Sequence, residues 1–322
     1  MTAKRKILIT GATGFIGRYL VQEAYDNEFE IYISIRESSN YSHLEHLGVK
    51  PILIDFSTLE STLESFMRAN CAAFDLVIHN AGVTNVFSES DFKKFNVDLT
   101  EYLCKALQEL NLLNGQFVYI SSIMASGPGD SVSLAQITED QPSRPISAYG
   151  RSKLLAEQRI EKSGLTYLIL RPTAVYGRGT EDFKDLVNGI RLGVSVYFNT
   201  TTQLVSFIHA HDLAQICFEC VDKGLHNDIF LISDGNRYSI AEFNKIVKKS
   251  CNAKVYLNIR VPHALVRLSG YVQNKLRITS PMNSVDRANE LLALNWHCRS
   301  TKLFQAIDYA IQHDLAEIIH HD

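Results

Sequence analysis

The first thirty residues contain the pattern that most restricts the fold of this chain. An apolar run, 6–10, leads into three glycines, Gly11, Gly14 and Gly17, and an amphipathic stretch follows. Glycines at such positions permit a tight turn, a close approach of backbone to a pyrophosphate, and close packing of helix on strand. The free N–H groups and positive dipole end of the helix would attract phosphates. The pattern therefore predicts nucleotide binding, although its spacing is G-x-x-G-x-x-G rather than G-x-G-x-x-G.

Short β-rich runs alternate with amphipathic stretches over the first 170 residues. Strands that alternate with helices imply right-handed βαβ units and a parallel sheet that is covered on both faces. We therefore expect an α/β fold with a Rossmann-like, doubly wound parallel sheet. The predicted strands are 6–10, 31–35, 51–54, 76–79, 117–120 and 167–170.

Helical patterns predominate after Arg171 and Pro172, near 182–192, 239–250, 262–275 and 301–318. One stretch, 205–232, is typical of a return to the sheet, as strand, helix with Asp212 as its N-cap, and strand. We predict a nucleotide-binding domain over 1–173 with 205–233 returning to it, and a smaller, mostly helical substrate-binding domain from 174–204 and 234–322. Within it, 261–275 is predicted as a packing helix, with a substrate lid or a membrane-surface helix as the alternatives.

Composition excludes several function classes. The chain has 32 basic and 35 acidic residues and a net charge of −3, which gives no basis for a nucleic-acid partner. No apolar run approaches the roughly 18 residues that a membrane helix needs. Cys217 and Cys220 have no second Cys/His pair at ligand spacing, so no metal is expected. The cysteines are scattered and no secretory signal is evident, so we expect reduced thiols and a cytoplasmic location.

The second predicted strand indicates which dinucleotide is bound. An acid about 20 residues after the glycines would bind the ribose hydroxyls of NAD, whereas an arginine accommodates the 2′-phosphate of NADP. Here the strand ends in Arg36, with Glu37 after it. We therefore expect NAD(P) as the cofactor, with NADP(H) favoured. Asp55, which closes the third strand, is placed to meet the adenine amino group, with a helix N-cap as the alternative role.

Tyr149 and Lys153 are four residues apart and so share one face of a helix. A nearby ammonium favours the phenolate and lowers the pKa of a tyrosine, which suits it to exchange a proton with an alcohol or ketone. The strand before this helix ends in Ser121 and Ser122, and a hydroxyl at the carboxyl edge of a sheet is suited to hold a substrate oxygen. These residues predict hydride-transfer chemistry.

Together these motifs resemble the extended short-chain dehydrogenase/reductase family, often called NAD-dependent epimerase/dehydratase proteins. The resemblance covers nearly the whole chain and is specific for the family but not for one substrate. It implies a Rossmann domain with a small substrate domain, and a homodimer that forms through helices near 88–112 and 148–163. The motifs that carry it are 10–17, Asp55, 78–82, Asn96, 121–122, Tyr149-x-x-x-Lys153, 170–177 and 206–214.

The resemblance also implies roles for individual residues. Ser122, Tyr149 and Lys153 look like the catalytic triad. The expected substrate-binding residues are Thr84, Ser122, Met124, Val175 and Tyr176. The expected cofactor-binding residues are Gly11, Thr13, Gly14, Phe15, Ile16, Gly17, Arg36, Asp55, Phe56, Asn80, Ala81, Gly82, Asn96, Ile120, Ser121, Tyr149, Lys153, Pro172 and Thr173.

Departures from the family pattern narrow the expected chemistry. Ser122 is followed by Ile123, Met124 and Ala125, so the acids that family dehydratases and decarboxylases use are missing there. The stretch 203–208 also has no arginine, where many nucleotide-sugar enzymes place one. The first hypothesis is an epimerase-like oxidoreductase acting on a sugar, which the family suggests is nucleotide-linked. The alternatives are an NADPH-dependent ketone or aldehyde reductase of the dihydroflavonol-reductase type and a non-enzymatic NADP(H) sensor.

Overall fold

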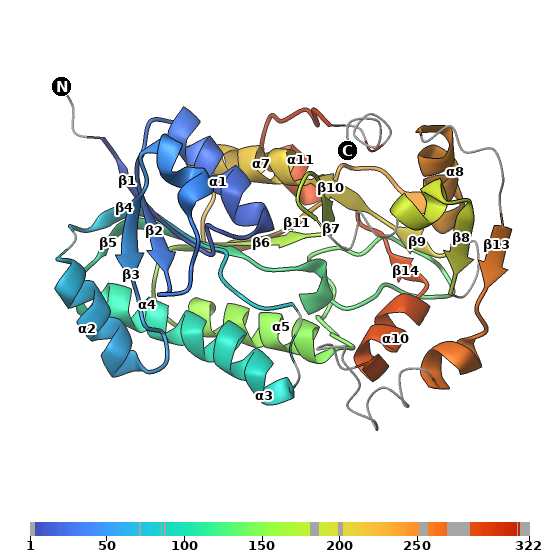
Figure 1. Ribbon diagram of the computed structural model, residues 1–322, viewed down its shortest axis with the longest axis horizontal. Helices are drawn as coiled ribbons and strands as arrows, with labels where there is room; N and C mark the ends of the chain where they lie inside the picture. The colour runs from blue at the N-terminus through green and yellow to red at the C-terminus, as the bar shows by residue number, and fades with distance from the viewer. Residues whose placement is uncertain are drawn as a thin grey trace.

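A seven-stranded parallel sheet forms the centre of the molecule (Figure 1). The computed structural model describes residues 4–70, 72–84, 86, 88–180, 187–198, 202–250, 257–268, 284–313 and 315. The strand order is β11-β6-β5-β4-β1-β2-β3, so the order reverses between β1 and β4. The strands are β1 (Lys6–Thr10), β2 (Glu30–Ile35), β3 (Lys50–Leu53), β4 (Phe74–His79), β5 (Leu113–Ile120), β6 (Tyr167–Pro172) and β11 (Asp228–Ile232). Each predicted strand is confirmed, and the crevice at the reversal is where such sheets bind ligands.

Helices cover both faces of this sheet, as a doubly wound fold requires (Figure 1). Helices α1 (Phe15–Asp26) and α7 (Ala210–Asp222) pack together on one face. The other face carries α2 (Leu59–Ala69), α4 (Leu99–Glu109) and α5 (Ala148–Glu161). Successive residues of β1 point to opposite faces, so Ile7 and Ile9 join the first apolar core and Leu8 joins the second. Burial on both faces explains why the strand reads as a continuous apolar run.

The later part of the chain forms small sheets and short helices at one end of the central sheet (Figure 1). Strand β11 joins β6, as expected for the returning segment. The stretch 205–209 does not join the large sheet, because its backbone pairs elsewhere. Strand β10 (Phe207–His209) pairs with β7 (Ala174–Tyr176), β9 (Leu204–Val205) with β12 (Tyr238–Ser239) and β14 (Asn295–Trp296), and β13 (Leu257–Arg260) with β8 (Val194–Tyr197). The boundary between the two proposed domains stays a prediction.

One predicted helix, 239–250, is confirmed, and another, 301–318, ends earlier than predicted. Helix α8 (Ile240–Ser250) confirms the pattern at 239–250. Helix α11 (Thr301–Ala306) ends early in the predicted 301–318, because the backbone N–H groups of Gln312 and His313 donate to the carboxylate of Asp212 instead of to a helix. Residue 315 is helical, and 314 and 316–318 lie outside the described residues. Of the other two predictions, 187–191 and 263–268 are helical, whereas 182–186 and 269–275 lie outside the described residues.

The start of α7 also differs from expectation. His209, not Asp212, is the N-cap, and its Nδ1 accepts the backbone N–H of His211 at 3.3 Å. Asp212 lies inside the first turn, where its two oxygens accept hydrogen bonds from Tyr309, Gln312 and His313. His209, Asp212 and His313 each bring one ligand-type atom within 4.8 Å of the others. The bonds to both carboxylate oxygens show that this cluster ties the C-terminal segment to α7.

Arg171 on β6 and Glu157 on α5 form a buried ion pair that fixes the helix to the sheet. Their side chains are 4% and 1% exposed, and two nitrogen–oxygen contacts of 2.6 and 3.0 Å join them. The Ser121 hydroxyl also donates to Glu157, and Ser126 accepts from Arg171. Buried charges of this kind are strongly destabilising when one partner is removed.

Removing Arg171 tests how much this pair matters. Arg171→Met leaves the Glu157 carboxylate buried and unpaired, so we expect the free energy of unfolding to fall by about 3–5 kcal/mol in urea denaturation. Lys223→Met is the matched control, because Lys223 is 48% exposed where it pairs with Glu219. Its expected loss is below ~1 kcal/mol. Similar losses in both variants would contradict a structural role for the buried pair.

Candidate active site

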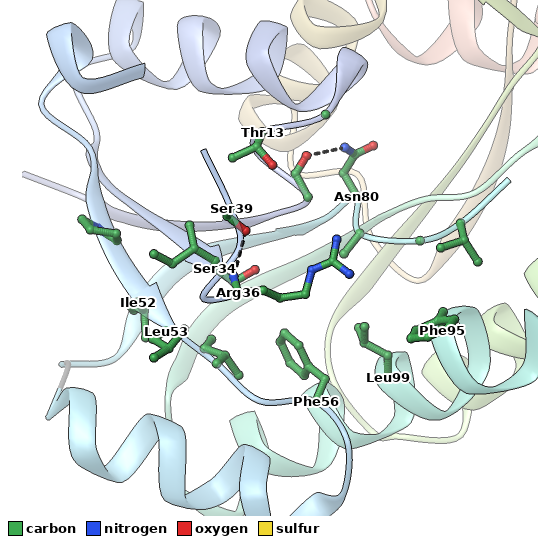
Figure 2. Close-up of a pocket in the computed structure, with 18 of the residues that line it drawn as sticks. Thr13, Ser34, Arg36, Ser39, Ile52, Leu53, Phe56, Asn80, Phe95 and Leu99 are labelled. Carbon is green, nitrogen blue, oxygen red and sulfur yellow. Dashed lines mark hydrogen bonds between the residues drawn. The ribbon is translucent and has the colours of Figure 1, made fainter. Parts of the chain in front are cut away.

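A cleft of about 1660 Å³ opens at the carboxyl ends of β1 to β5 (Figure 2). It runs from the glycine turn and the end of β2 to Tyr149 and Lys153 on α5. The location is the switch point of the sheet, where the strand order reverses. The predicted site residues that line it are Gly11, Thr13, Gly14, Phe15, Ile16, Arg36, Asp55, Phe56, Asn80, Ala81, Gly82, Thr84, Ile120, Ser121, Tyr149 and Lys153.

The glycine turn fits the diphosphate of a dinucleotide. Gly11 has φ +66°, and a Cβ there would lie 2.7 Å from the backbone nitrogen of Ala81. A Cβ on Gly17 would lie 2.1 Å from the carbonyl oxygen of Gly11. Helix α1 starts from Gly14 without a side-chain cap, so no side chain takes up the N–H groups of its first turn. Such a helix start suits an anionic ligand.

Arg36 occupies the expected place at the end of β2. It is exposed, its backbone N–H donates to Ser39 Oγ at 2.9 Å, and its side chain extends into the cleft (Figure 2). Asp55 lies at the end of β3 and also lines the cleft. The backbone N–H of Ser57 donates to Asp55 and holds the pKa of that carboxyl below its ordinary value. Thr58 is the N-cap of α2, which leaves Asp55 facing the cleft.

Asn96 lies behind the residues that line the cleft. It lies in a π-helical turn, Lys93–Asp98, and is 1% exposed. Its amide oxygen accepts the N–H of Val83 at 2.8 Å, and its amide nitrogen donates to the Val83 carbonyl and to Ser152. These bonds use the side chain to hold the loop after Gly82. The direct cofactor contact expected for Asn96 stays a prediction.

Tyr149 and Lys153 lie on α5, which begins where Ser147 accepts the N–H of Gly150. Both line the cleft, and the side chain of Ser122 is hydrogen-bonded to Tyr149. Lys153 is 5% exposed, and its Nζ donates to the Ile120 carbonyl at 2.8 Å and to the Tyr119 hydroxyl oxygen at 3.1 Å. The fold thus brings Tyr149 and Lys153 into one end of the cleft lining, with Ser122 against Tyr149 behind it.

The electrostatics differ from the expected lowering of the tyrosine pKa. Burial raises the pKa of Tyr149 to about 12, the Ser122 hydrogen bond opposes this, and the negative charge of Glu290 adds to it. Burial lowers the pKa of Lys153 to about 8, against the attraction of Glu157. Desolvation of the phenolate therefore outweighs the other influences. With the protein's own groups alone, Tyr149 is a protonated hydroxyl at neutral pH.

Several predicted site residues lie outside the cleft lining. Tyr176 is fully buried and donates to the His313 carbonyl, and its expected role in substrate binding stays a prediction. Thr173 is 5% exposed and donates to the Ile232 carbonyl. Ser121 lines the cleft, but its hydroxyl donates to Glu157. The predicted residues outside the lining are Gly17, Asn96, Ser122, Met124, Pro172, Thr173, Val175 and Tyr176.

Sequence reasoning also missed residues of the cleft. Lys94 and Phe95 line it from the π-helical turn Lys93–Asp98, Leu99 from the first residue of α4, and Arg68 from the last turn of α2 (Figure 2 shows Phe95 and Leu99). For Lys94, Phe95 and Leu99 the available signal was that their helical segment follows β4, since helix starts gather at the carboxyl edge of a parallel sheet. Arg68 lies at the end of its helix and had no such signal. No local motif marks them.

Comparison with known proteins places the chain in a family. Residues 7–233 match the family model described as "NAD dependent epimerase/dehydratase family". The chain belongs to this family. Within the described residues, no helix combines the length and apolar character needed to cross a bilayer.

Relatives of this chain act on different substrates. It is 25% identical over 275 residues to the decarboxylating sterol-4-alpha-carboxylate 3-dehydrogenase of Dictyostelium discoideum, covering 81% of this chain and 82% of that protein. It is 27% identical over 252 residues to UDP-glucose 4-epimerase of Vibrio cholerae, covering 74% and 73%. The structure of UDP-glucuronic acid 4-epimerase from Bacillus cereus, with UDP-glucuronic acid and NAD, superposes with a TM-score of 0.74 at 19% identity, covering 98% and 96%. The chain is thus an NAD-dependent oxidoreductase of the epimerase/dehydratase family.

The glycine turn gives a direct test of the cleft. In Gly17→Ala the new Cβ would meet the Gly11 carbonyl at 2.1 Å, so we expect NAD⁺ and NADP⁺ binding to be lost in calorimetric titration, together with a lower Tm. Gly189→Ala is the matched control, because its Cβ would meet nothing closer than 3.8 Å. Wild-type affinity in a folded Gly17→Ala protein would contradict the assignment of the turn.

Proposed function

We propose that this protein transfers hydride between a dinucleotide bound in the cleft and a hydroxyl or ketone carbon of its substrate. The observation that carries the proposal is that Tyr149, with Ser122 against it, and Lys153 lie at one end of a cleft that the glycine turn also lines. The first substrate class is a sugar, and the relationship to a UDP-glucose 4-epimerase supports a nucleotide-linked one. The relationship to a sterol dehydrogenase supports oxidation of a secondary alcohol more generally.

Each catalytic side chain has a role that follows from its chemistry. A bound nicotinamide ring supplies or accepts the hydride. Tyr149 donates its proton to the substrate oxygen during ketone reduction and takes it back during alcohol oxidation. Ser122 hydrogen-bonds the same oxygen. Lys153 holds the nicotinamide ribose and supplies positive charge near the phenolate. In an epimerase Tyr149 performs both steps in one turnover, with the hydride returned to the other face of the ketone.

Arg36 supports a second candidate, an NADPH-dependent ketone or aldehyde reductase. Its guanidinium extends into the cleft and forms no ion pair with any acid among the described residues, so it is available for a 2′-phosphate (Figure 2). Mass spectrometry of dinucleotide released from denatured protein separates the candidates. Retained, near-stoichiometric NAD⁺ supports the epimerase. An empty protein that prefers NADPH supports the reductase.

We also propose a homodimer that forms through helices near 88–112 and 148–163. Helices α4 and α5 pack side by side in one outer layer, and Leu155 on α5 is 46% exposed, which supports an interface there. We also propose that the protein functions in the reducing environment of the cytoplasm. The cysteines among the described residues are free and buried, as reduced structural thiols are.

Replacing Tyr149 tests the catalytic assignment. Tyr149→Phe removes the exchangeable proton, so we expect kcat to fall at least ~10²-fold while the Kd for the cofactor stays unchanged. The raised pKa predicts that alcohol oxidation by the wild type, measured at saturating NAD⁺, quickens as pH rises above neutral, since the phenolate is the base. Ketone reduction, which needs the protonated form, should not quicken. Turnover that survives in Tyr149→Phe would overturn the assignment.

Arg36→Ala tests the choice of dinucleotide. Loss of the guanidinium removes a charged hydrogen-bond donor to the 2′-phosphate, so we expect the Kd for NADPH to rise about 10–100-fold in fluorescence titration. NADH has no such phosphate and should bind almost as before. Arg68→Ala removes the arginine that lines the cleft from α2 and should affect both dinucleotides alike. Equal weakening of NADH and NADPH in Arg36→Ala would contradict the proposed role.

A further inference from the structure

A continuous chain of buried polar side chains lies beneath Lys153. Thr10 on β1, His79 on β4, Thr100 on α4 and Tyr119 on β5 are all fully buried. Thr10 Oγ1 lies 2.6 Å from His79 Nδ1, and His79 Nε2 lies 2.8 Å from Thr100 Oγ1. Thr100 also interacts with the side chain of Tyr119, whose hydroxyl oxygen accepts a hydrogen bond from Lys153 Nζ at 3.1 Å. The chain thus runs from the strand that precedes the glycine turn to the proposed catalytic lysine.

Two backbone contacts, one to Thr100 and one to Thr10, fix the direction of the hydrogen bonds on either side of His79. Thr100 Oγ1 lies 2.6 Å from the carbonyl oxygen of Asn96. A carbonyl oxygen can only accept, so the Thr100 hydroxyl donates its proton to Asn96. His79 must therefore donate through Nε2 and accept through Nδ1. The hydroxyl of Thr10 donates to that Nδ1, and its oxygen accepts the backbone N–H of Ala81 at 3.1 Å.

The same reasoning settles the orientation of Tyr119. An ammonium has donors only, so the Tyr119 oxygen accepts from Lys153 and the Tyr119 proton points away from Nζ. Thr100 Oγ1 interacts with Tyr119, and its own proton goes to Asn96, so it is the neighbouring oxygen that can accept the Tyr119 proton. Burial raises the pKa of Tyr119 well above its ordinary value and lowers that of His79 to about 3, which keeps both groups neutral. The His79 ring also stacks on the Tyr119 ring, with centroids 5.4 Å apart and planes inclined at 22°.

We propose that Tyr119 is a positioning residue for Lys153, and that Thr10, His79 and Thr100 hold its hydroxyl in the accepting orientation. The Ile120 carbonyl takes a second N–H of the ammonium. The third N–H then remains for a ligand in the cleft that Lys153 lines. The inference rests on the proposed role of Lys153 at the cofactor. It adds which groups orient the Lys153 ammonium and keep it protonated.

The charge of Lys153 depends on few neighbours. Its titratable surroundings are Glu157 on α5, His79 on β4, Tyr119 on β5 and Tyr149 one turn earlier on α5. Glu157 alone favours the charged form of Lys153 by its charge, because burial keeps the other three groups neutral. Loss of the Tyr119 oxygen therefore removes one of two hydrogen-bond acceptors from a nearly buried ammonium and favours its neutral form.

The test is a titration of Lys153 in Tyr119→Phe. Protein with ¹³C-labelled lysine is followed by NMR from neutral to alkaline pH, and the Lys153 signal is assigned with Lys153→Arg. We expect the midpoint to fall by about one pH unit from that of the wild type. The alkaline loss of NAD⁺ affinity should move by the same amount. Tyr167→Phe, on the neighbouring strand β6, is the matched control and should leave the midpoint unchanged.

Thr100 provides a second arm if the tyrosine variant is too unstable. Thr100→Val removes the acceptor of both Tyr119 and His79 and should lower the midpoint, whereas Thr100→Ser keeps the hydroxyl and should restore it. An unchanged Lys153 midpoint in folded Tyr119→Phe or Thr100→Val overturns the inference. The titration needs no substrate, so its result does not depend on the result of the Tyr149→Phe test of the proposed function.

Discussion

The structure around the cleft depends on keeping the ammonium group of Lys153 charged although it is almost fully buried. Lys153 is 5% exposed, and burial alone would drive it toward the neutral form. The charge persists because the Ile120 carbonyl and the Tyr119 oxygen accept from it and Glu157 lies one turn along the helix. Gly82 belongs to the same arrangement, since a Cβ there would lie 3.7 Å from Nζ and 3.0 Å from Asn96 Oδ1. The floor of the cleft is thus shaped around the lysine.

The helix that carries Lys153 is fixed at both of its ends by charge. Toward its C-terminus, Glu157 pairs with Arg171 on β6. At its N-terminus, the backbone N–H of Ala148 donates to Asp286 at 2.5 Å, and Asp286 lies on α10 (Ser284–Leu292). A carboxylate at a helix N-terminus is favourable. The contact also places Tyr149 next to an element from the last forty residues, so the later part of the chain helps to position the catalytic hydroxyl.

Local patterns explain what the sequence could predict. The glycine turn, the strands and the Tyr149–Lys153 spacing are each encoded within about a dozen residues, and the structure confirms their placement. The polarity around Tyr149 is not local. Glu290, which raises its pKa, lies far along the chain on α10, and no periodicity links the two. The irregular backbone at Gln312 and His313 is likewise set by a distant carboxylate, Asp212.

The protonation of Tyr149 separates the two candidate reactions by what each demands of the bound state. A reductase needs a proton donor, and the protein's own groups already provide one, because burial holds the pKa of Tyr149 at about 12. An epimerase must also remove a proton from a hydroxyl, which requires the phenolate. Positive charge must then approach Tyr149 on binding and offset both desolvation and the charge of Glu290. Lys153, held charged by Tyr119 and Glu157, is the cation in the cleft best placed to contribute, so the orientation of one buried hydroxyl bears on which reaction the site supports.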